Sequence, residues 1–426
     1  MDRSSKIGTG SLEMANAINT CRFCGSGLKR IFIDLGISPL ANSYLKPEDL
    51  HQMEPHYPLC VYVCEECYLV QLPVYQTPEE IFGDYAYFSS YSDSWLKHAK
   101  AYTELMVSRF GYGPNSRVIE IASNDGYLLQ YFKRKSVPVL GIEPAKNVAR
   151  AANEAGIPTV VKFFGTSTAM ELAAEGKNAD LLIGNNVLAH VPALNDFVEG
   201  MKIILKRDGV ITMEFPHLMR LIDENQFDTV YHEHFSYFSL ITVEKVFAKQ
   251  GLSIFDVEEL PTHGGSLRIY ARHEEDRSKP VSLRVTELKN REEAKGFTQL
   301  EFYRAFGSKV KETKRNILEF LIRAKGDGKS IAGYGAPAKG NTLLNYCGIR
   351  TDFIDYTVDR SPHKQGHYLP GTHIPIYHPD KIKETKPDYV VILPWNLKEE
   401  IMEQMSHIRE WGGQFFVLIP EPRVYP

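Results

Sequence analysis

The chain has 426 residues but only six cysteines, and it has no continuous apolar run of about 18 residues. A transmembrane helix is therefore not expected, and neither is a membrane partner. Six cysteines are too few for a disulfide scaffold, which would also require an oxidising compartment that nothing in the sequence indicates. The segment MDRSSKIGTGSLEMANAINT lacks the apolar core of a signal peptide, so we expect a cytoplasmic protein.

An excess of positive charge is also missing. Lysine and arginine total 49 against 53 acidic residues, giving a net charge of -4. Nucleic-acid-binding domains usually carry a concentrated basic surface, so nucleic acid is not an expected partner. With 43% hydrophobic residues, no internal repeat and no low-complexity tract, the chain is predicted to be globular, with two or three domains.

Four of the cysteines form two Cys-x-x-Cys knuckles, Cys21 with Cys24 and Cys64 with Cys67. Two such turns can bring four thiolates together around a tetrahedral zinc ion. We therefore predict a structural Zn²⁺ site in a small N-terminal domain. Cys60 and Cys347 are expected to be ordinary interior residues.

From about residue 109, short apolar runs alternate with helical segments, which predicts a parallel sheet covered by helices. A second, shorter α/β unit begins near residue 330 and resembles half of a doubly wound domain. The charged stretch 291–325 between them favours helix. The predicted modules are 1–75 (zinc domain), 76–108 (connector and candidate lid), 109–285 (nucleoside-binding domain), 286–325 (helical linker) and 326–426 (Rossmann-like domain).

Three elements of the middle module predict a bound nucleoside. The first strand ends in an acid and enters a helix through a tight Asn-Asp-Gly turn, the second strand ends in an acid that can accept both ribose hydroxyls, and two amides follow the fourth strand. No glycine-lined pocket is offered to a pyrophosphate, which disfavours a dinucleotide here. The predicted cofactor residues are Glu120, Ser123, Asn124, Asp125, Gly126, Glu143, Asn185 and Asn186.

The segment Tyr231-His232-Glu233-His234 concentrates four titratable groups. Histidine can take a proton near neutral pH, and a tyrosine hydroxyl can hydrogen-bond an oxyanion, so the segment suits proton abstraction next to a carbonyl. A metal site is the less favoured alternative, because the cysteines already provide a complete ligand set. If the segment is extended, His232 points away from its neighbours and is expected at the surface.

The run Gly333-Tyr-Gly335-Ala-Pro-Ala-Lys339-Gly-Asn341 follows a strand and precedes a helix, and Asp359 comes about 20 residues later. Three interpretations remain open: Lys339 and the helix N-terminus hold a substrate pyrophosphate, the glycines serve only close packing, or the loop binds a dinucleotide. The polar turn His263-Gly264-Gly265-Ser266-Leu-Arg268 is a candidate for lining the same substrate pocket.

Taken in order, the zinc knuckles, EIASNDG, YHEHFSYFS, HGGSLR and GYGAPAKG resemble the S-adenosylmethionine-dependent sugar C-methyltransferases of deoxysugar pathways, from about Cys21 to the C-terminus. The resemblance implies a class I methyltransferase domain, S-adenosylmethionine as cofactor, and methylation of a nucleotide-linked 4-keto-6-deoxyhexose at carbon 3. Carbon 5 is the alternative position, because close relatives methylate there.

The resemblance also carries over catalytic residues, namely Tyr231, Glu233, His234, His190 and Tyr85. We favour His234 as the base, with Tyr231 as the rival. The substrate-binding candidates are His263, Gly264, Ser266, Arg268, Gly335, Lys339 and Asn341. These candidate residues predict an enzyme, and we expect it to be a monomer. Methyl transfer to oxygen or nitrogen and a non-catalytic zinc scaffold are the alternatives.

Overall fold

The computed structural model describes residues 20–82 and 89–426, and the chain divides into two compact units. Of the described residues, unit 1 contains those up to Lys29 and those within Cys64–His217 and Phe235–Thr298. Unit 2 contains Arg30–Val63, Leu218–His234 and Gln299–Pro426. Both units are discontinuous in sequence. The five contiguous modules therefore stay a prediction about domain boundaries.

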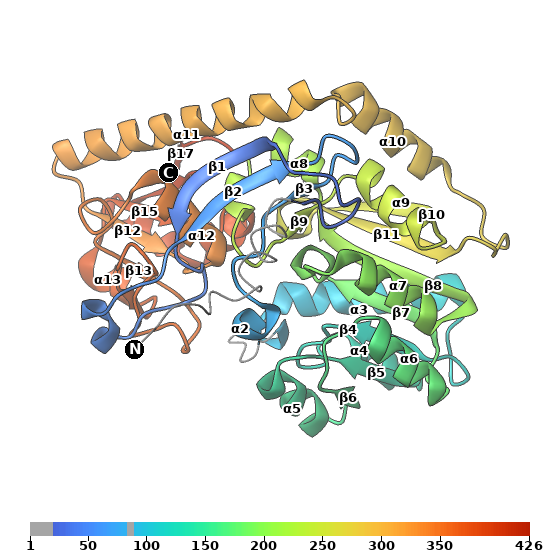
Figure 1. Cartoon of the computed structure of the whole chain (residues 1–426). Coiled ribbons are helices and arrows are strands. Elements are labelled where there is room, and N and C mark those ends of the chain that lie inside the picture. Colours follow the sequence, from blue (N-terminus) through green and yellow to red (C-terminus); the bar gives the residue numbers. More distant parts are fainter. Residues whose placement is uncertain (1–19, 83–88) are drawn as a thin grey trace, which may run out of the picture. The chain divides into compact units, whose positions relative to one another are not determined.

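The centre of unit 1 is a seven-stranded sheet with the order β10-β11-β8-β7-β4-β5-β6 (Figure 1). All neighbouring pairs from β8 to β6 are parallel, whereas β11 runs antiparallel to both of its neighbours. The strands are β4 (Val118–Ile121), β5 (Val139–Ile142), β6 (Thr159–Val160), β7 (Ala179–Asn185), β8 (Leu205–Pro216), β10 (Leu252–Leu260) and β11 (Ser266–His273).

Helices cover the parallel part of this sheet, and every residue of β4, including Glu120, is buried. The helices of unit 1 are α2 (Pro78–Phe82), α3 (Asp93–Phe110), α4 (Leu129–Arg134), α5 (Lys146–Glu154), α6 (Thr166–Ala174), α7 (Leu194–Ile204), α9 (Leu240–Lys249) and α10 (Leu283–Lys295). Short 3₁₀ turns lie at Ser89–Tyr91 (η2), Leu188–His190 (η3) and Thr262–Gly264 (η5).

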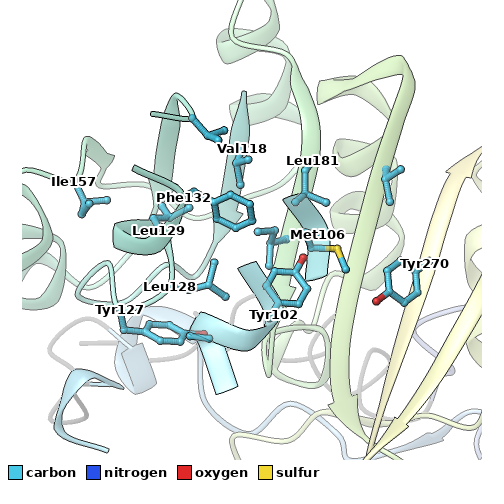
Figure 2. Packing of buried hydrophobic residues seen from close by; sticks show 14 of the residues in the cluster. Tyr102, Met106, Val118, Tyr127, Leu128, Leu129, Phe132, Ile157, Leu181 and Tyr270 are labelled. Carbon is cyan, nitrogen blue, oxygen red and sulfur yellow. The ribbon is translucent and has the colours of Figure 1, made fainter. Parts of the chain in front are cut away.

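Helix α3 shows how the sequence builds this core. It starts where the Ser92 hydroxyl accepts a hydrogen bond from the Trp95 amide, and it ends at Gly111, which has a positive φ of 72°. Trp95, Tyr102 and Met106 recur at helical spacing, so they fall on one face. Figure 2 shows Tyr102 and Met106 in one hydrophobic cluster with residues of the sheet and of α4.

Unit 2 contains a six-stranded sheet with the order β14-β13-β12-β15-β16-β17 (Figure 1). Its strands are parallel except for β17, which pairs antiparallel with β16. They are β12 (Ile331–Tyr334), β13 (Tyr356–Val358), β14 (Ile376–Tyr377), β15 (Tyr389–Ile392), β16 (Gln414–Val417) and β17 (Arg423–Tyr425). This arrangement confirms the predicted second α/β half.

Helices and short turns complete unit 2. They are η1 (Pro47–His51), α8 (Leu218–Asp223), η4 (Phe227–Thr229), α11 (Leu300–Gly326), α12 (Ala338–Cys347), α13 (Lys381–Thr385), η6 (Trp395–Leu397), α14 (Lys398–Gln404) and η7 (Ser406–Trp411). The predicted helical stretch is split, because Gly296 ends α10 with a φ of 100° before α11 begins.

Segments that are distant in sequence pair within each unit. In unit 2, β1 (Arg30–Ser38) and β2 (Tyr57–Val63) form an antiparallel pair, and α11 packs along β1. In unit 1, β3 (Val70–Gln71) pairs antiparallel with β9 (Ser236–Tyr237). The stretch between the two cysteine knuckles thus belongs to unit 2, although the knuckles themselves belong to unit 1.

Candidate active site and zinc centre

The four knuckle cysteines converge as the sequence predicts. Their sulfur atoms all lie within 4.8 Å of one another, with Cys21 Sγ 3.5 Å from Cys67 Sγ and Cys24 Sγ 3.5 Å from Cys64 Sγ. Zinc–sulfur bonds of about 2.3 Å in a tetrahedron require sulfur–sulfur distances of about 3.8 Å. The donor set and its spacing therefore fit a tetrahedral zinc ion. Of the other two thiols, Cys347 is buried and Cys60 is partly buried.

Local backbone turns aim these sulfurs at one point. The Gly25 amide donates to the Cys21 carbonyl at 2.9 Å, and the Tyr68 amide donates to the Cys64 carbonyl at 3.0 Å. Gly25 and Tyr68 both have positive φ, which lets the backbone of each knuckle reverse tightly after its second cysteine. The two knuckles are thus built alike.

The predicted cofactor turn follows β4 in unit 1. Ala122, Asn124 and Gly126 have φ angles of 55°, 49° and 79°, so the chain turns sharply there before α4. A Cβ atom on Gly126 would lie 2.8 Å from Ile157 Cγ1, so only glycine fits. The Ser89 amide donates to Asn124 Oδ1 at 2.9 Å, and Ser90 hydrogen-bonds Asp125, so η2 is anchored to this turn.

Glu143, which directly follows β5, belongs to the same site. Its Oε2 accepts a hydrogen bond from the Asn124 amide and its Oε1 accepts one from the Ala145 amide, both at 2.9 Å. Each carboxylate oxygen has a second lone pair, so these contacts leave room for ribose hydroxyls. The carboxyl ends of β4 and β5 thus place the turn and the acid side by side, as the sequence predicts.

Three acidic side chains lie at or beside this turn. Among the described residues, no lysine or arginine pairs with Glu120, Asp125 or Glu143. Burial raises the pKa of Glu120 well above its ordinary value, and the nearby Asp125 and Glu143 carboxyls raise it further. Burial likewise raises the pKa of Glu143. A cationic ligand suits this environment, because opposite charge favours ionised carboxylates.

Unsatisfied polar atoms lie at the same sheet edge. Within residues 20–82 and 89–426, the Ser123 hydroxyl, both side-chain polar atoms of Asn185 and Oδ1 of Asn186 are buried without a hydrogen-bond partner. Asn185 ends β7, and Asn186 has a positive φ of 52°. Buried polar groups are normally paired, so these atoms indicate a ligand-binding edge. His190 ends the 3₁₀ turn η3, which follows them.

The Tyr231–His234 segment lies in unit 2 and begins two residues after the last residue of η4, Thr229. The rings of Tyr231 and His234 have centroids 4.0 Å apart, and His234 Nδ1 lies 2.8 Å from the Thr229 carbonyl oxygen. A carbonyl can only accept, so Nδ1 carries the proton of the neutral ring and Nε2 carries the lone pair. His234 is therefore oriented as a base through Nε2.

Glu233 and His232 lie in a turn and not in an extended strand. Glu233 is buried, and burial raises its pKa to about 7, opposed by a 2.5 Å hydrogen bond from Asn42 Nδ2 to its Oε1. The expectation that His232 lies at the surface is wrong, because it is 4% exposed and its Nε2 contacts the Pro58 carbonyl at 3.2 Å. The turn, unlike a strand, does not send alternate side chains to opposite faces.

Sequence reasoning missed Asn42, which lies between the two knuckles. The same stretch reaches the glycine-rich loop, since the Tyr44 hydroxyl donates to the Ala336 carbonyl at 2.5 Å and Asn341 Nδ2 donates to the Ala41 carbonyl at 2.6 Å. An asparagine 191 residues from its partner carries no local signal of this pairing.

The glycine-rich loop joins β12 to α12 in unit 2. Gly335 has a φ of 91°, and a Cβ there would lie 2.5 Å from Pro394 Cδ, so close packing explains this glycine. Lys339 Nζ donates to Asn396 Oδ1 at 2.7 Å and lies 4.6 Å from the centre of the Trp395 ring. Burial lowers the pKa of Lys339, and the charge of Asp228 opposes that shift.

Asp228 is a second residue that sequence reasoning missed. It is fully buried in η4, and its Oδ2 accepts a 2.6 Å hydrogen bond from Trp395 Nε1. Burial raises its pKa to about 6, against the opposing charge of Lys339. Asp228 therefore links η4 to Trp395, over whose ring Lys339 lies.

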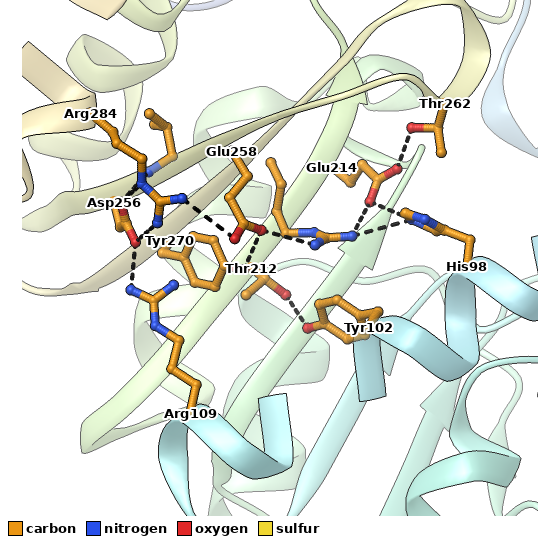
Figure 3. Close-up of polar contacts among 12 residues, drawn as sticks. His98, Tyr102, Arg109, Thr212, Glu214, Asp256, Glu258, Thr262, Tyr270 and Arg284 are labelled. Atoms are coloured by element: carbon orange, nitrogen blue, oxygen red, sulfur yellow. Dashed lines mark hydrogen bonds and ion pairs between the residues drawn. The ribbon is translucent and has the colours of Figure 1, made fainter. Parts of the chain in front are cut away.

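The turn after β10 carries the next candidates, and Figure 3 shows Thr262 of this turn beside Glu214 of β8, to which its hydroxyl donates at 2.8 Å. His263 Nε2 accepts a hydrogen bond from Asn186 Nδ2 at 2.8 Å, and the Ser266 hydroxyl donates to the Thr262 carbonyl. Gly264 lies in the same turn with a φ of 90°.

Arg268 is 3% exposed and pairs with Glu214 at 2.7 Å and with Glu258 at 3.1 Å. Although burial acts to raise the pKa of Glu214, His98 and Arg268 hold it at about 2. Arg268 thus holds two carboxylates, and its contact with substrate stays a prediction. Tyr85, the remaining catalytic candidate, lies outside the described residues.

Comparison with known proteins identifies the family to which this chain belongs. Residues 21–82 match the model "Putative zinc binding domain", residues 95–257 "Methyltransferase domain" and residues 261–420 "C-methyltransferase C-terminal domain". C-methyltransferase NovU of Streptomyces niveus is 36% identical over 417 residues, which cover 97% of this chain and 98% of that protein. The chain belongs to the C-methyltransferase family. The resemblance inferred from the motifs is thereby confirmed at the level of the family.

More distant proteins match only parts of the chain. Ubiquinone biosynthesis O-methyltransferase of Bartonella tribocorum (strain CIP 105476 / IBS 506) is 28% identical over 98 residues, 23% of this chain and 40% of that protein. The solved PH0226 protein of Pyrococcus horikoshii OT3 is 16% identical, covers 47% of this chain and 99% of its own, and has a TM-score of 0.37.

The chain is thus an S-adenosylmethionine-dependent C-methyltransferase with a class I α/β domain and an N-terminal zinc-binding domain. Its acidic, partly unsatisfied turn fits the cofactor, whose sulfonium and ammonium groups are cationic. Among the described helices, none is long and apolar enough to cross a bilayer.

Proposed function

We propose that the enzyme methylates carbon 3 of a nucleotide-linked 4-keto-6-deoxyhexose, through an enolate that its own base generates. Carbon next to a ketone becomes a nucleophile only after a proton is removed, so such an enzyme needs a base and a group that stabilises the enolate oxygen. When bound, S-adenosylmethionine supplies the electrophilic methyl group.

The hydrogen bond from His234 to the Thr229 carbonyl carries this proposal. It leaves Nε2 as the lone-pair nitrogen of the neutral ring, which is the arrangement a general base requires. The adjacent Tyr231 ring restricts the imidazole on one side. We therefore assign proton removal to His234 Nε2, and Tyr231 is the alternative base.

Glu233 is suited to the enolate oxygen. With a pKa raised to about 7, its carboxyl holds a proton over much of the neutral range and can donate a hydrogen bond to an oxyanion. The Tyr231 hydroxyl is the second candidate donor. Proton removal by His234 leaves the electron pair of the C–H bond in the enolate. That pair would form the new carbon–methyl bond as the methyl–sulfur bond of the cofactor breaks, with the electrons of the broken bond left on sulfur.

The loop after β12 is our candidate for the nucleotide end of the substrate. Lys339 lies in the first turn of α12, where an ammonium group and free backbone amides both attract a pyrophosphate. The close fit of Gly335 against Pro394 supports packing as a further role of the same loop. A dinucleotide is the least favoured occupant, because Pro337 and Lys339 fit it poorly.

Several finer assignments belong to this proposal. We place the enzyme in deoxysugar biosynthesis and expect it to act as a monomer. We place it in the cytoplasm, where the cysteines of the zinc site stay reduced. Carbon 5 of the same substrate class is the alternative position. The name of the relative from Streptomyces niveus, a C-methyltransferase, supports a carbon acceptor over oxygen or nitrogen.

Proton exchange tests the proposal without methyl transfer. The enzyme with S-adenosylhomocysteine and a panel of keto sugar nucleotides is placed in deuterium oxide, and NMR follows each carbon-bound proton. We expect deuterium at carbon 3 of one substrate. Exchange at carbon 5 favours the alternative position. In a parallel reaction with S-adenosylmethionine, methyl transfer to oxygen or nitrogen by an enzyme that shows no exchange at either carbon overturns the proposal.

A further inference from the structure

Gln71 contacts a zinc-ligating cysteine through its side chain. Its Nε2 donates to Cys21 Sγ at 3.1 Å, and its Oε1 accepts the backbone amide of Arg22 at 3.0 Å. Gln71 is 1% exposed and Cys21 is 3% exposed, so water does not compete for these bonds. The amide of Gln71 therefore bridges two successive residues of the first knuckle.

Hydrogen bonds of this kind matter because four thiolates and one zinc ion carry a net negative charge, and three of the four cysteines are buried. An amide N–H directed at sulfur offsets part of that charge and fixes the direction of the ligand. Arg22 adds positive charge nearby. Its guanidinium lies 5.5 Å from the centre of the Phe235 ring and hydrogen-bonds the Leu72 carbonyl.

Gln71 also belongs to the short strand β3, whose partner follows the catalytic segment. Gln71 pairs with Ser236 of β9, and the Leu72 amide donates to the Phe235 carbonyl at 3.0 Å. The Phe235 amide in turn donates to the Ala189 carbonyl at 2.8 Å. Ala189 lies in η3, directly before His190.

These contacts form one continuous path within unit 1. We propose that Gln71 is an outer-shell residue of the zinc centre and a positioning residue, which couples the metal to β9 and to the turn that carries His190. The first link is the buried side chain of Gln71, and the later links are backbone hydrogen bonds between buried residues, so no flexible surface side chain takes part. The consequence for catalysis rests on the proposed role of His190.

Zinc affinity gives the first test. Gln71→Glu keeps the oxygen that accepts the Arg22 amide but replaces the donor with a second oxygen beside sulfur. We expect zinc affinity, measured by chelator competition, to fall about 10- to 100-fold. Gln71→Met, which removes both hydrogen bonds without adding charge, should also lower the zinc affinity. Gln250→Glu, at the end of α9, is the matched control with the same charge change. Wild-type affinity in both Gln71 variants overturns the proposal.

Amide hydrogen exchange gives the second test, independent of turnover. In Gln71→Met and in the chelated wild type, we expect faster exchange in peptides that cover residues 69–72 and 235–238, with no change in β4 and β5. Unchanged protection of both peptides overturns the coupling. If protection falls while turnover at saturating zinc stays normal, the coupling stands and the catalytic role of His190 fails.

Discussion

The turn after β4 in unit 1 and the turn after β12 in unit 2 share one backbone plan but differ in charge. In each, an acid at the end of the neighbouring strand accepts an amide from the turn. Glu143 accepts from Asn124 at 2.9 Å, and Asp359 accepts from Ala336 at 2.7 Å. Beyond that hydrogen bond the two sites diverge, so topology alone does not determine what each one binds.

The divergence lies in the side chains around the turns. No lysine or arginine among the described residues pairs with Glu143, whereas Lys364 lies 3.8 Å from the Asp359 carboxylate and donates to the Ala336 carbonyl. Lys339 adds a second cation beside the unit 2 turn. An uncompensated acidic site suits the cationic methyl donor, and a site with two lysines suits an anionic nucleotide.

The largest expected effect separates chemistry in unit 2 from cofactor binding in unit 1. His234→Asn should slow both methyl transfer and deuterium exchange by about 100- to 10,000-fold, because an auxiliary proton-transfer group is lost. Calorimetric affinity for S-adenosylmethionine should not change. Tyr231→Phe is the matched control, since it keeps the ring and deletes only the hydroxyl. Wild-type exchange in both variants and in the double variant would refute the assignment.

The next effect tests the basic turn. Lys339→Gln keeps most of the side-chain length and removes the charge, so we expect substrate binding to weaken by about 1.5–3 kcal/mol. Cofactor affinity should stay at the wild-type value. Steady-state kinetics should therefore show a higher KM for the sugar nucleotide. A lower melting temperature with an unchanged KM would instead make packing the main role of this loop.

The acidic turn provides the reciprocal experiment. Glu143→Ala should weaken S-adenosylmethionine binding by about 1–3 kcal/mol, because ribose hydroxyls lose a charged acceptor. Glu143→Gln is the matched variant, which retains one acceptor oxygen. Calorimetric titration should rank the wild type above Gln and Gln above Ala, with deuterium exchange into substrate retained. Equal affinity in all three proteins would place the ribose elsewhere.

The positions of both turns and of their acids could be predicted from the sequence, because each turn is formed by a short stretch of chain. A strand, a turn rich in small residues, a helix and an acid about 20 residues after the turn define each site over a short stretch. The two knuckles were predictable for the same reason, since Cys-x-x-Cys spacing is local geometry.

The contacts that join distant segments could not be predicted. Gln71 and Asn42 look like ordinary polar residues, and only the folded chain brings them to Cys21 and Glu233. The prediction that His232 lies at the surface was wrong for a related reason. It assumed an extended segment, and the structure has a turn there. Pairing over 50 or 191 residues depends on tertiary packing, which local patterns do not encode.

The smallest effect concerns the pH dependence of unit 2. If the protonated Glu233 carboxyl donates to the enolate oxygen, kcat should fall as pH rises through about 7, because the donor ionises. Glu233→Gln remains a neutral donor at every pH, so this fall should disappear.

Asn42→Ala removes the hydrogen bond that favours the ionised form of Glu233, so the fall in kcat should move to higher pH. A shift to lower pH in Asn42→Ala would contradict the sign of this coupling, and a fall that persists in Glu233→Gln would show that another group titrates.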